Sequence, residues 1–209
     1  MSIAAEPSPE PSYAEKLPKA IAGALCLDFV NTVTWRGDPA RQAERLTSYG
    51  ELVLWSRLLG TLNQKTADAL LAAAKRAPKD AERVRQRALA LRHEIEHLFG
   101  PNLAKPAKTP VLDTLTREMG RAGRWVPGKG WQPAAATPDL NLPLLPVAVS
   151  ALALATAPQQ LRARSCADPQ CSWMFLDESK NQSRQWCSME DCGNRAKARA
   201  HYARSRGKN

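Results

Sequence analysis

Apolar residues along most of the chain recur at intervals of three and four, the spacing that places them on one face of a helix. The clearest stretch runs from about Lys79 to Phe99. Its apolar stripe consists of Val84, Ala88, Leu91, Ile95 and Leu98. The same spacing predicts helices over Leu46–Leu59, Lys65–Arg76 and Thr109–Met119. It also predicts an earlier helix with one face made of Cys26, Phe29, Val30 and Val33. We therefore expect a mainly α domain, with Cys26 buried in its core.

Two segments depart from this pattern. Residues 121–134 hold two tryptophan-containing pieces on either side of Pro-Gly-Lys-Gly, which predicts a small β-hairpin. The stretch Leu140–Leu161 is uncharged, but three prolines interrupt it. Its continuous apolar part, Val147–Ala157, is too short to cross a bilayer. We expect a buried core helix there and no membrane partner.

Composition changes near Pro158. Residues 161–209 hold ten of the 30 basic residues, five of the 20 acidic residues and four of the five cysteines. This change predicts a helical domain over residues 18–158 and a second module over residues 161–209. Residues 1–17 are acidic and rich in proline and serine, so we expect a disordered tail. They contain no secretory signal, which favours a cytoplasmic location.

The second module contains two cysteine pairs with equal internal spacing. Four residues separate Cys166 from Cys171, and four separate Cys187 from Cys192. Two such pairs, joined by a hairpin-sized segment, are typical of a tetrahedral site that holds one structural Zn²⁺ per chain. Two disulfides are the alternative, which a reducing cytosol disfavours. Four thiolates leave no open position on the metal, so we expect no enzymatic role for it.

The residues around the cysteines predict the shape of this finger. Trp173–Leu176 and Ser183–Trp186 are expected to pair as the two strands of a hairpin. Ser188 begins a capping-box-like start for a final helix, with Cys192 in its first turn. The expected fold class is thus a helical domain with a small β-hairpin, followed by a treble-clef or ribbon-like Cys₄ finger with a terminal helix.

The terminal helix carries positive charge only. The chain as a whole has a net charge of +10, and no acidic residue follows Asp191. Six basic residues do: Arg195, Lys197, Arg199, Arg204, Arg206 and Lys208. A charge run is usually a solvated face, but one of a single sign beside a zinc module favours nucleic-acid binding.

A second metal-binding pattern lies in the longest helix. Residues 93–97 read His-Glu-Ile-Glu-His, which is the zincin pattern with His93 and His97 as ligands and Glu94 as general base. Helical geometry places both histidines opposite the apolar stripe, on a convex solvated face. A catalytic zinc needs a cleft, so we interpret this pattern as surface and keep the metalloprotease as a remote alternative.

The C-terminal residues resemble a known zinc finger. Cys166-x₄-Cys171 and Trp186-Cys187-x₄-Cys192-Gly-Asn-Arg195 are similar to the CGNR finger. The stretch Leu25–Val33, with Arg36, Tyr49 and Trp55, resembles the ABATE domain, which accompanies this finger in bacterial proteins described as stress-induced transcription regulators. The resemblance implies zinc binding by the four cysteines and a DNA-facing helix.

These observations favour a one-component transcription regulator. The finger would bind double-stranded DNA, and the helical domain would sense a small-molecule effector or form a homodimer. Asp28 and Asn31 are polar residues on an otherwise apolar helix, so they are candidates for a ligand pocket. The alternative is a zinc-stapled module that binds RNA or another protein.

Overall fold

The computed structural model describes residues 19–100, 108–128, 130–133 and 139–206. Helices dominate this part of the chain, and three small antiparallel sheets of two strands each accompany them. The mainly α fold expected from the apolar spacing is confirmed. The tail expected over residues 1–17 lies outside the described residues.

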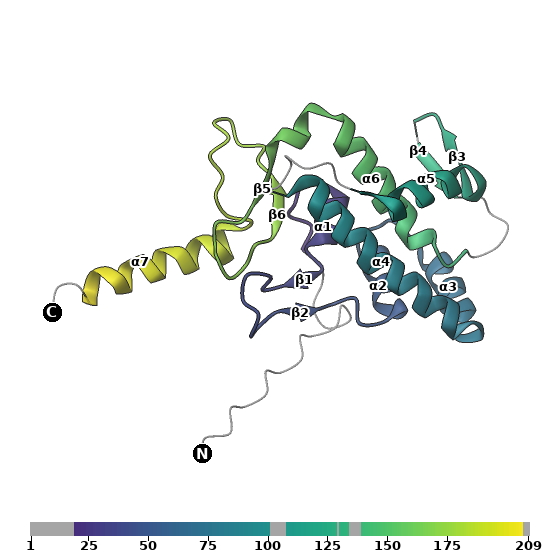
Figure 1. Ribbon diagram of the computed structural model, residues 1–209, viewed down its shortest axis with the longest axis horizontal. Helices are drawn as coiled ribbons and strands as arrows, with labels where there is room; N and C mark the ends of the chain where they lie inside the picture. The colour runs from purple at the N-terminus through teal and green to yellow at the C-terminus, as the bar shows by residue number, and fades with distance from the viewer. Residues whose placement is uncertain (1–18, 101–107, 129, 134–138, 207–209) are drawn as a thin grey trace, which may run out of the picture.

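A short central helix organises the core. Helix α1 (Leu25–Val30) packs against α4 (Pro78–Phe99), α6 (Leu145–Thr156) and strand β6 (Met174–Leu176) (Figure 1). Its Phe29 ring meets the Trp55 ring edge-on, with 5.2 Å between the centroids. Cys26 is fully buried, as expected, and burial raises the pKa of its thiol to about 11.

Polar caps set where the surrounding helices begin. The Ser48 hydroxyl accepts a hydrogen bond from the Glu51 N–H (3.1 Å), so α2 starts at Tyr49 (Tyr49–Leu58) rather than at Leu46. The Asn63 side chain caps α3 (Gln64–Arg76) in the same way. Helix α5 spans Pro110–Ala122. The four predicted helices are therefore present, with ends that differ by a few residues.

The first predicted helix was too long. It ends at Asn31, and Val33 lies in β1 (Val33–Thr34), paired antiparallel with β2 (Ala43–Glu44). The physical reason is a tertiary contact. The Asn31 side chain donates to the Met174 carbonyl and accepts from the Met174 N–H, both at 2.8 Å, so it bonds the edge of β6. Helix α1 stops there, and Val33 is not part of its apolar face.

The two segments that depart from helical spacing follow their predictions. Strands β3 (Gly123–Val126) and β4 (Gly130–Pro133) form a hairpin, with Trp125 opposite Trp131. The 3₁₀ turn η1 (Leu142–Leu144) leads into α6, whose apolar side chains are mostly buried. Within the described residues, no helix is long and apolar enough to span a membrane.

The finger begins with η2 (Pro158–Arg162) and β5 (Ala163–Ser165), which pairs with β6. The expected second strand, Ser183–Trp186, is irregular instead. The free edge of β6 is already used, because Leu176 N–H donates to the Ala22 carbonyl (2.7 Å) and Asn31 binds Met174. The hairpin is therefore formed by β5 and β6, which flank Cys166 and Cys171. It is not formed by two strands that both lie between the cysteine pairs.

The described part of the chain ends in one π-helical turn, η3 (Met189–Gly193), and helix α7 (Asn194–Arg206). Helix α7 projects away from the rest of the molecule, and its first turn rests on the finger (Figure 1). This arrangement places the basic end of the chain on a protruding helix that the body of the protein does not cover.

Candidate metal centre and nucleic-acid interface

The first cysteine pair lies in the turn between β5 and β6. Cys166 N–H donates to the Trp173 carbonyl (2.7 Å), which closes the hairpin. Cys171 N–H donates to the Asp168 carbonyl (2.9 Å), which makes a tight turn between the two cysteines. The strand pairing therefore brings both thiols to the same side of the hairpin.

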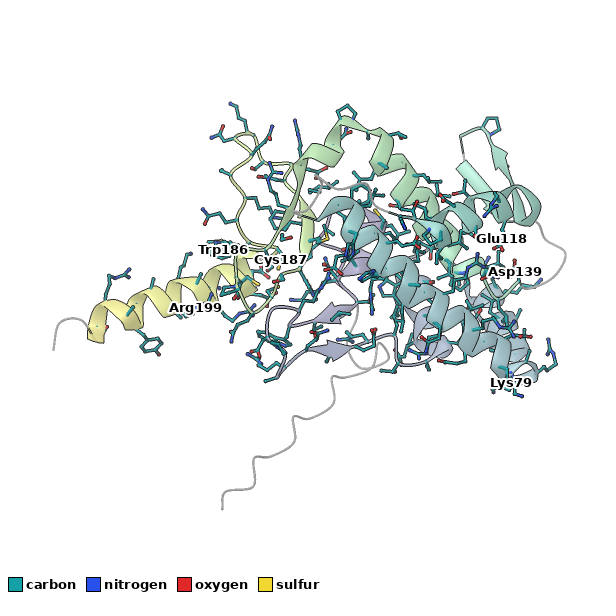
Figure 2. The ribbon with its side chains drawn as sticks, viewed as in Figure 1. Lys79, Glu118, Asp139, Trp186, Cys187 and Arg199 are labelled. Atoms are coloured by element: carbon teal, nitrogen blue, oxygen red, sulfur yellow. The ribbon has the colours of Figure 1, made fainter. Side chains whose placement is uncertain are left out.

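The second pair is presented by a loop and a helix start. Arg184 organises the loop, because its guanidinium donates to the carbonyl oxygens of Cys187 (2.6 Å) and Trp186 (3.0 Å). Ser188 caps η3 by accepting the Asp191 N–H (3.2 Å), which confirms the predicted helix start. Cys192 then lies in the opening helical turn, as expected. Figure 2 shows Trp186 and Cys187 close to the base of α7.

The four cysteines converge on one point. Their Sγ atoms all lie within 4.8 Å of one another, and all four residues are buried. The Sγ–Sγ distance is 3.6 Å for Cys171 and Cys187 and 3.4 Å for Cys187 and Cys192. Tetrahedral zinc with Zn–S bonds of about 2.3 Å needs sulfur atoms about 3.8 Å apart, so this set fits Zn²⁺ closely. The expected structural zinc site is confirmed.

Ionisation of all four thiols in the cluster would require a cation. Hydrogen bonds from the neighbouring thiols of Cys171 and Cys187 lower the pKa of Cys166, whereas sharing a proton with Cys166 raises the pKa of Cys171. A group of buried thiols cannot all ionise together without positive charge. Bound zinc would supply that charge in place of the protons, with the four cysteines as its ligands.

Comparison with known families agrees with this geometry. Residues 162–205 match the CGNR zinc finger. Residues 23–158 match the ABATE family, described as "Putative stress-induced transcription regulator". The chain belongs to the ABATE family. No curated protein matches the chain. We refer below to the part before Pro158 as the ABATE domain and to the part after it as the CGNR finger.

The CGNR finger contains a buried acid that sequence reasoning missed. Asp168 is fully buried, and it accepts hydrogen bonds from Arg195 Nε (3.0 Å) and Arg199 Nη2 (3.2 Å). Arg195 Nη2 also donates to Cys192 Sγ (2.9 Å). Such bonds to a ligand sulfur orient it and offset the negative charge of a Cys₄ site. The sequence signal for this role was an acidic residue between two cysteines in a basic segment.

A loop of the ABATE domain completes this cluster. The Arg41 guanidinium lies over the Trp35 ring, 3.4 Å from the ring centroid. The Arg195 guanidinium lies 4.8 Å from the same centroid. In the same loop, a Cβ on Gly37 would lie 1.7 Å from the Pro169 carbonyl oxygen, so only glycine fits. The ABATE domain thus contacts both the first cysteine turn and the base of α7.

The predicted nucleic-acid residues fall into two groups. Arg195 and Arg199 bind Asp168, with side chains 35% and 46% exposed, and so help to hold α7 on the finger. Lys197 and Arg204 are exposed along α7. Arg206 ends α7 but its side chain is not described, and Lys208 lies outside the described residues. Contact of these residues with nucleic acid stays a prediction.

Asp28 and Asn31 are buried where α1 meets the finger. Asp28 Oδ1 accepts hydrogen bonds from the N–H groups of Ile21 and Ala22, both at 3.0 Å. Burial raises the pKa of Asp28 to about 6. Both residues also line a cavity between the two regions. Contact of either residue with a ligand stays a prediction.

The zincin-like pattern serves a structural purpose. His93 and His97 are exposed on α4, as predicted, whereas Glu94 is buried. The two Glu94 carboxylate oxygens accept the N–H groups of Val111 and Leu112 (2.9 Å each), so Glu94 caps the start of α5. Among the described residues, the four cysteines alone form a group with metal-binding geometry.

Proposed function

We propose that the protein is a DNA-binding transcription regulator, in which the CGNR finger positions α7 and α7 contacts the duplex. The observation that carries this proposal is the placement of α7. It projects from a finger built for zinc, and its exposed charged residues are all basic. The function involves recognition and no catalysis, in keeping with a Cys₄ site that leaves no open metal position.

The dimensions of α7 suit this role. Its 13 residues span about 20 Å at about 1.5 Å per residue. The major groove of B-DNA is about 12 Å wide and admits an α-helix. Small residues, Ala196, Ala198, Ala200 and Ala203, alternate with the basic ones, so α7 is narrow for much of its length. Lys197 and Arg204 are exposed and suited to contact phosphates.

The structure changes which residues should be substituted to test the interface. Arg195 and Arg199 are partly neutralised by Asp168, and Arg195 also bonds a ligand sulfur, so their loss would disturb the finger. Lys197 and Arg204 are exposed, and within the described residues neither pairs with Asp168 or bonds a ligand sulfur. The matched control is Lys75→Gln with Lys79→Gln, which removes two exposed charges; Figure 2 labels Lys79 at the opposite end of the molecule.

The experiment is fluorescence anisotropy on duplex DNA over a salt series, with zinc content checked for each variant. Lys197→Gln with Arg204→Gln should weaken binding and flatten the slope of log K against log salt by about 1.8, at about 0.9 per phosphate contact. The control pair should leave that slope unchanged. Equal effects of both pairs, or no binding by the wild type, would contradict the proposal. Tighter binding to structured RNA in competition would favour the RNA-binding alternative.

A further inference from the structure

A cavity of about 140 Å³ lies between the ABATE domain and the CGNR finger. Its lining comes from α1, from α2, from Trp173 just before β6 and from Arg195 in the first turn of α7, segments that are far apart in the sequence. Figure 1 shows α1 beside β6, with which it is in contact. Three of the six tryptophans of the chain line it: Trp35, Trp55 and Trp173. Residues from both regions thus contribute aromatic rings to one cavity.

The zinc site borders this cavity. Cys171, Cys187 and Cys192 are among the residues that line it. A site for a water-sized particle needs only about 10–15 Å³, far less than the volume present. An engineered cavity of about 150 Å³ accepts benzene. The remaining space therefore suits a molecule with a single ring, and the closed Cys₄ set leaves it no position on the metal.

The charges around the cavity select the kind of molecule. Lys19 binds Asp191 and Arg195 binds Asp168, so these two lining cations are engaged. Arg45 also has an interaction, although not through a hydrogen bond from its buried Nε. Asp28 is different. It is 8% exposed, and its Oδ1 accepts two backbone N–H groups, but within the described residues it forms no ion pair. Its second carboxylate oxygen is available to a donor from a ligand.

We propose that this cavity binds a small aromatic cation with N–H donors, held beside Trp55 and Trp173 and by a charge-assisted hydrogen bond to Asp28. Cations bind favourably near aromatic rings, and a buried carboxylate without a cationic partner gains most from a positively charged ligand. An anion of the same shape would meet Asp28 without a donor. Asn31 holds the wall in place, because both ends of its amide bond Met174.

The location suggests what binding would do. The ligand would contact α1 and α2 on one side and Trp173 and Arg195 of the finger on the other. A molecule shared by both regions stabilises one relative placement of the ABATE domain and α7. This effector role rests on the proposed DNA binding, whereas occupation of the cavity by the ligand does not.

The test uses two probes of equal shape and opposite charge, benzamidine and benzoate, with the full zinc-loaded chain. Intrinsic tryptophan fluorescence and titration calorimetry report binding independently of DNA. Benzamidine should bind, and Asp28→Asn should weaken it at least about tenfold while it keeps the Oδ1 acceptor. Asp68→Asn, an exposed change on α3, should have no effect. Benzoate should bind more weakly than benzamidine to the wild type.

Benzoate binding as tightly as benzamidine, equal benzamidine binding by Asp28→Asn, or no benzamidine binding at millimolar concentration would each overturn the proposal. Comparison of the two probes on the wild type needs no variant, so a folding defect in Asp28→Asn could not hide the result. A second arm measures duplex DNA affinity with and without benzamidine. Ligand binding without any DNA binding would refute the proposed function and leave the site standing.

Discussion

At the scale of single residues, one buried acid explains why the two arginines nearest the metal differ from the other bases of α7. Asp168 accepts a hydrogen bond from each of Arg195 and Arg199, and Arg195 reaches on to Cys192 Sγ. The Asn194 side chain donates to the Glu190 carbonyl (2.9 Å), which ties η3 to α7. Asn194 and Arg195 therefore have roles in building the finger before any role in recognition.

Asp28 gives a prediction that depends on pH. Its pKa is raised from 3.8 to about 6 by burial, so between these values the folded protein holds a proton that the unfolded chain releases. Stability contributed by this group therefore falls as pH rises through that window and stays low above it. Asp28→Asn removes the buried charge, so it should raise the free energy of unfolding at neutral pH by up to about 3 kcal/mol, at about 1.36 kcal/mol per pKa unit.

The measurement is urea unfolding of both proteins at several pH values, without added ligand. The gain from Asp28→Asn should be largest above about pH 6 and should vanish only below about pH 3, where Asp28 is protonated in both states. A gain that is constant across this range would mean that the charge of Asp28 is not responsible.

At the scale of elements, α7 differs from every other long helix of the described chain. Its first turn rests on η3, and the residues from Lys197 to Ser205 are all exposed. Helices of this length are marginal in water without tertiary packing. We expect the amides from about residue 200 onward to exchange rapidly in the free protein, and those of α4 to be protected.

DNA should change this behaviour. If α7 enters a groove, hydrogen exchange measured by mass spectrometry should slow over α7 on addition of duplex DNA, while exchange over α3 stays the same. Strong protection of α7 before DNA is added would contradict the view that α7 lacks tertiary packing in the free protein.

At the scale of the whole molecule, the CGNR finger is not a separate body. Met174 and Leu176 of β6 belong to the main hydrophobic core, and Trp173 Nε1 donates to the Val33 carbonyl (2.8 Å). Asn31 and Gly37 join the ABATE domain to the finger from the other side. Loss of order in the finger should therefore reduce the stability of the ABATE domain as well.

Removal of zinc tests this coupling. A chelator, or Cys187→Ser, should lower the melting temperature of the helical circular dichroism signal in one cooperative transition. A loss of about 3 kcal/mol corresponds to a fall of roughly 6–12 °C for a chain of this size. The wild type should hold one zinc per chain, and the chelator should have no further effect on Cys187→Ser. Two transitions, with that of the ABATE domain unchanged, would show that the parts are independent.

Local features were sufficient to predict much of the molecule. The three- and four-residue spacing located the long helices, because each buries one apolar stripe, as α4 does with Val84, Ala88, Leu91 and Ile95. The equal cysteine spacing predicted the metal site, because a tetrahedral ion requires short turns that each present two thiolates. Helical geometry was also enough to predict that His93 and His97 face away from the core.

Contacts between distant segments decided the rest. The pairing of β6 could not be inferred locally, because Ala22 and Asn31 occupy the edge that Ser183–Trp186 would have used. Asp168 and Arg195 are 27 residues apart, so their bond and its effect on the charge of α7 depend on the folded finger. The cavity exists only because Asp28 and Trp55 meet Trp173 across two regions of the chain. Periodicity and spacing describe what neighbouring residues can do, whereas an edge, an ion pair or a cavity belongs to surfaces that only folding brings together.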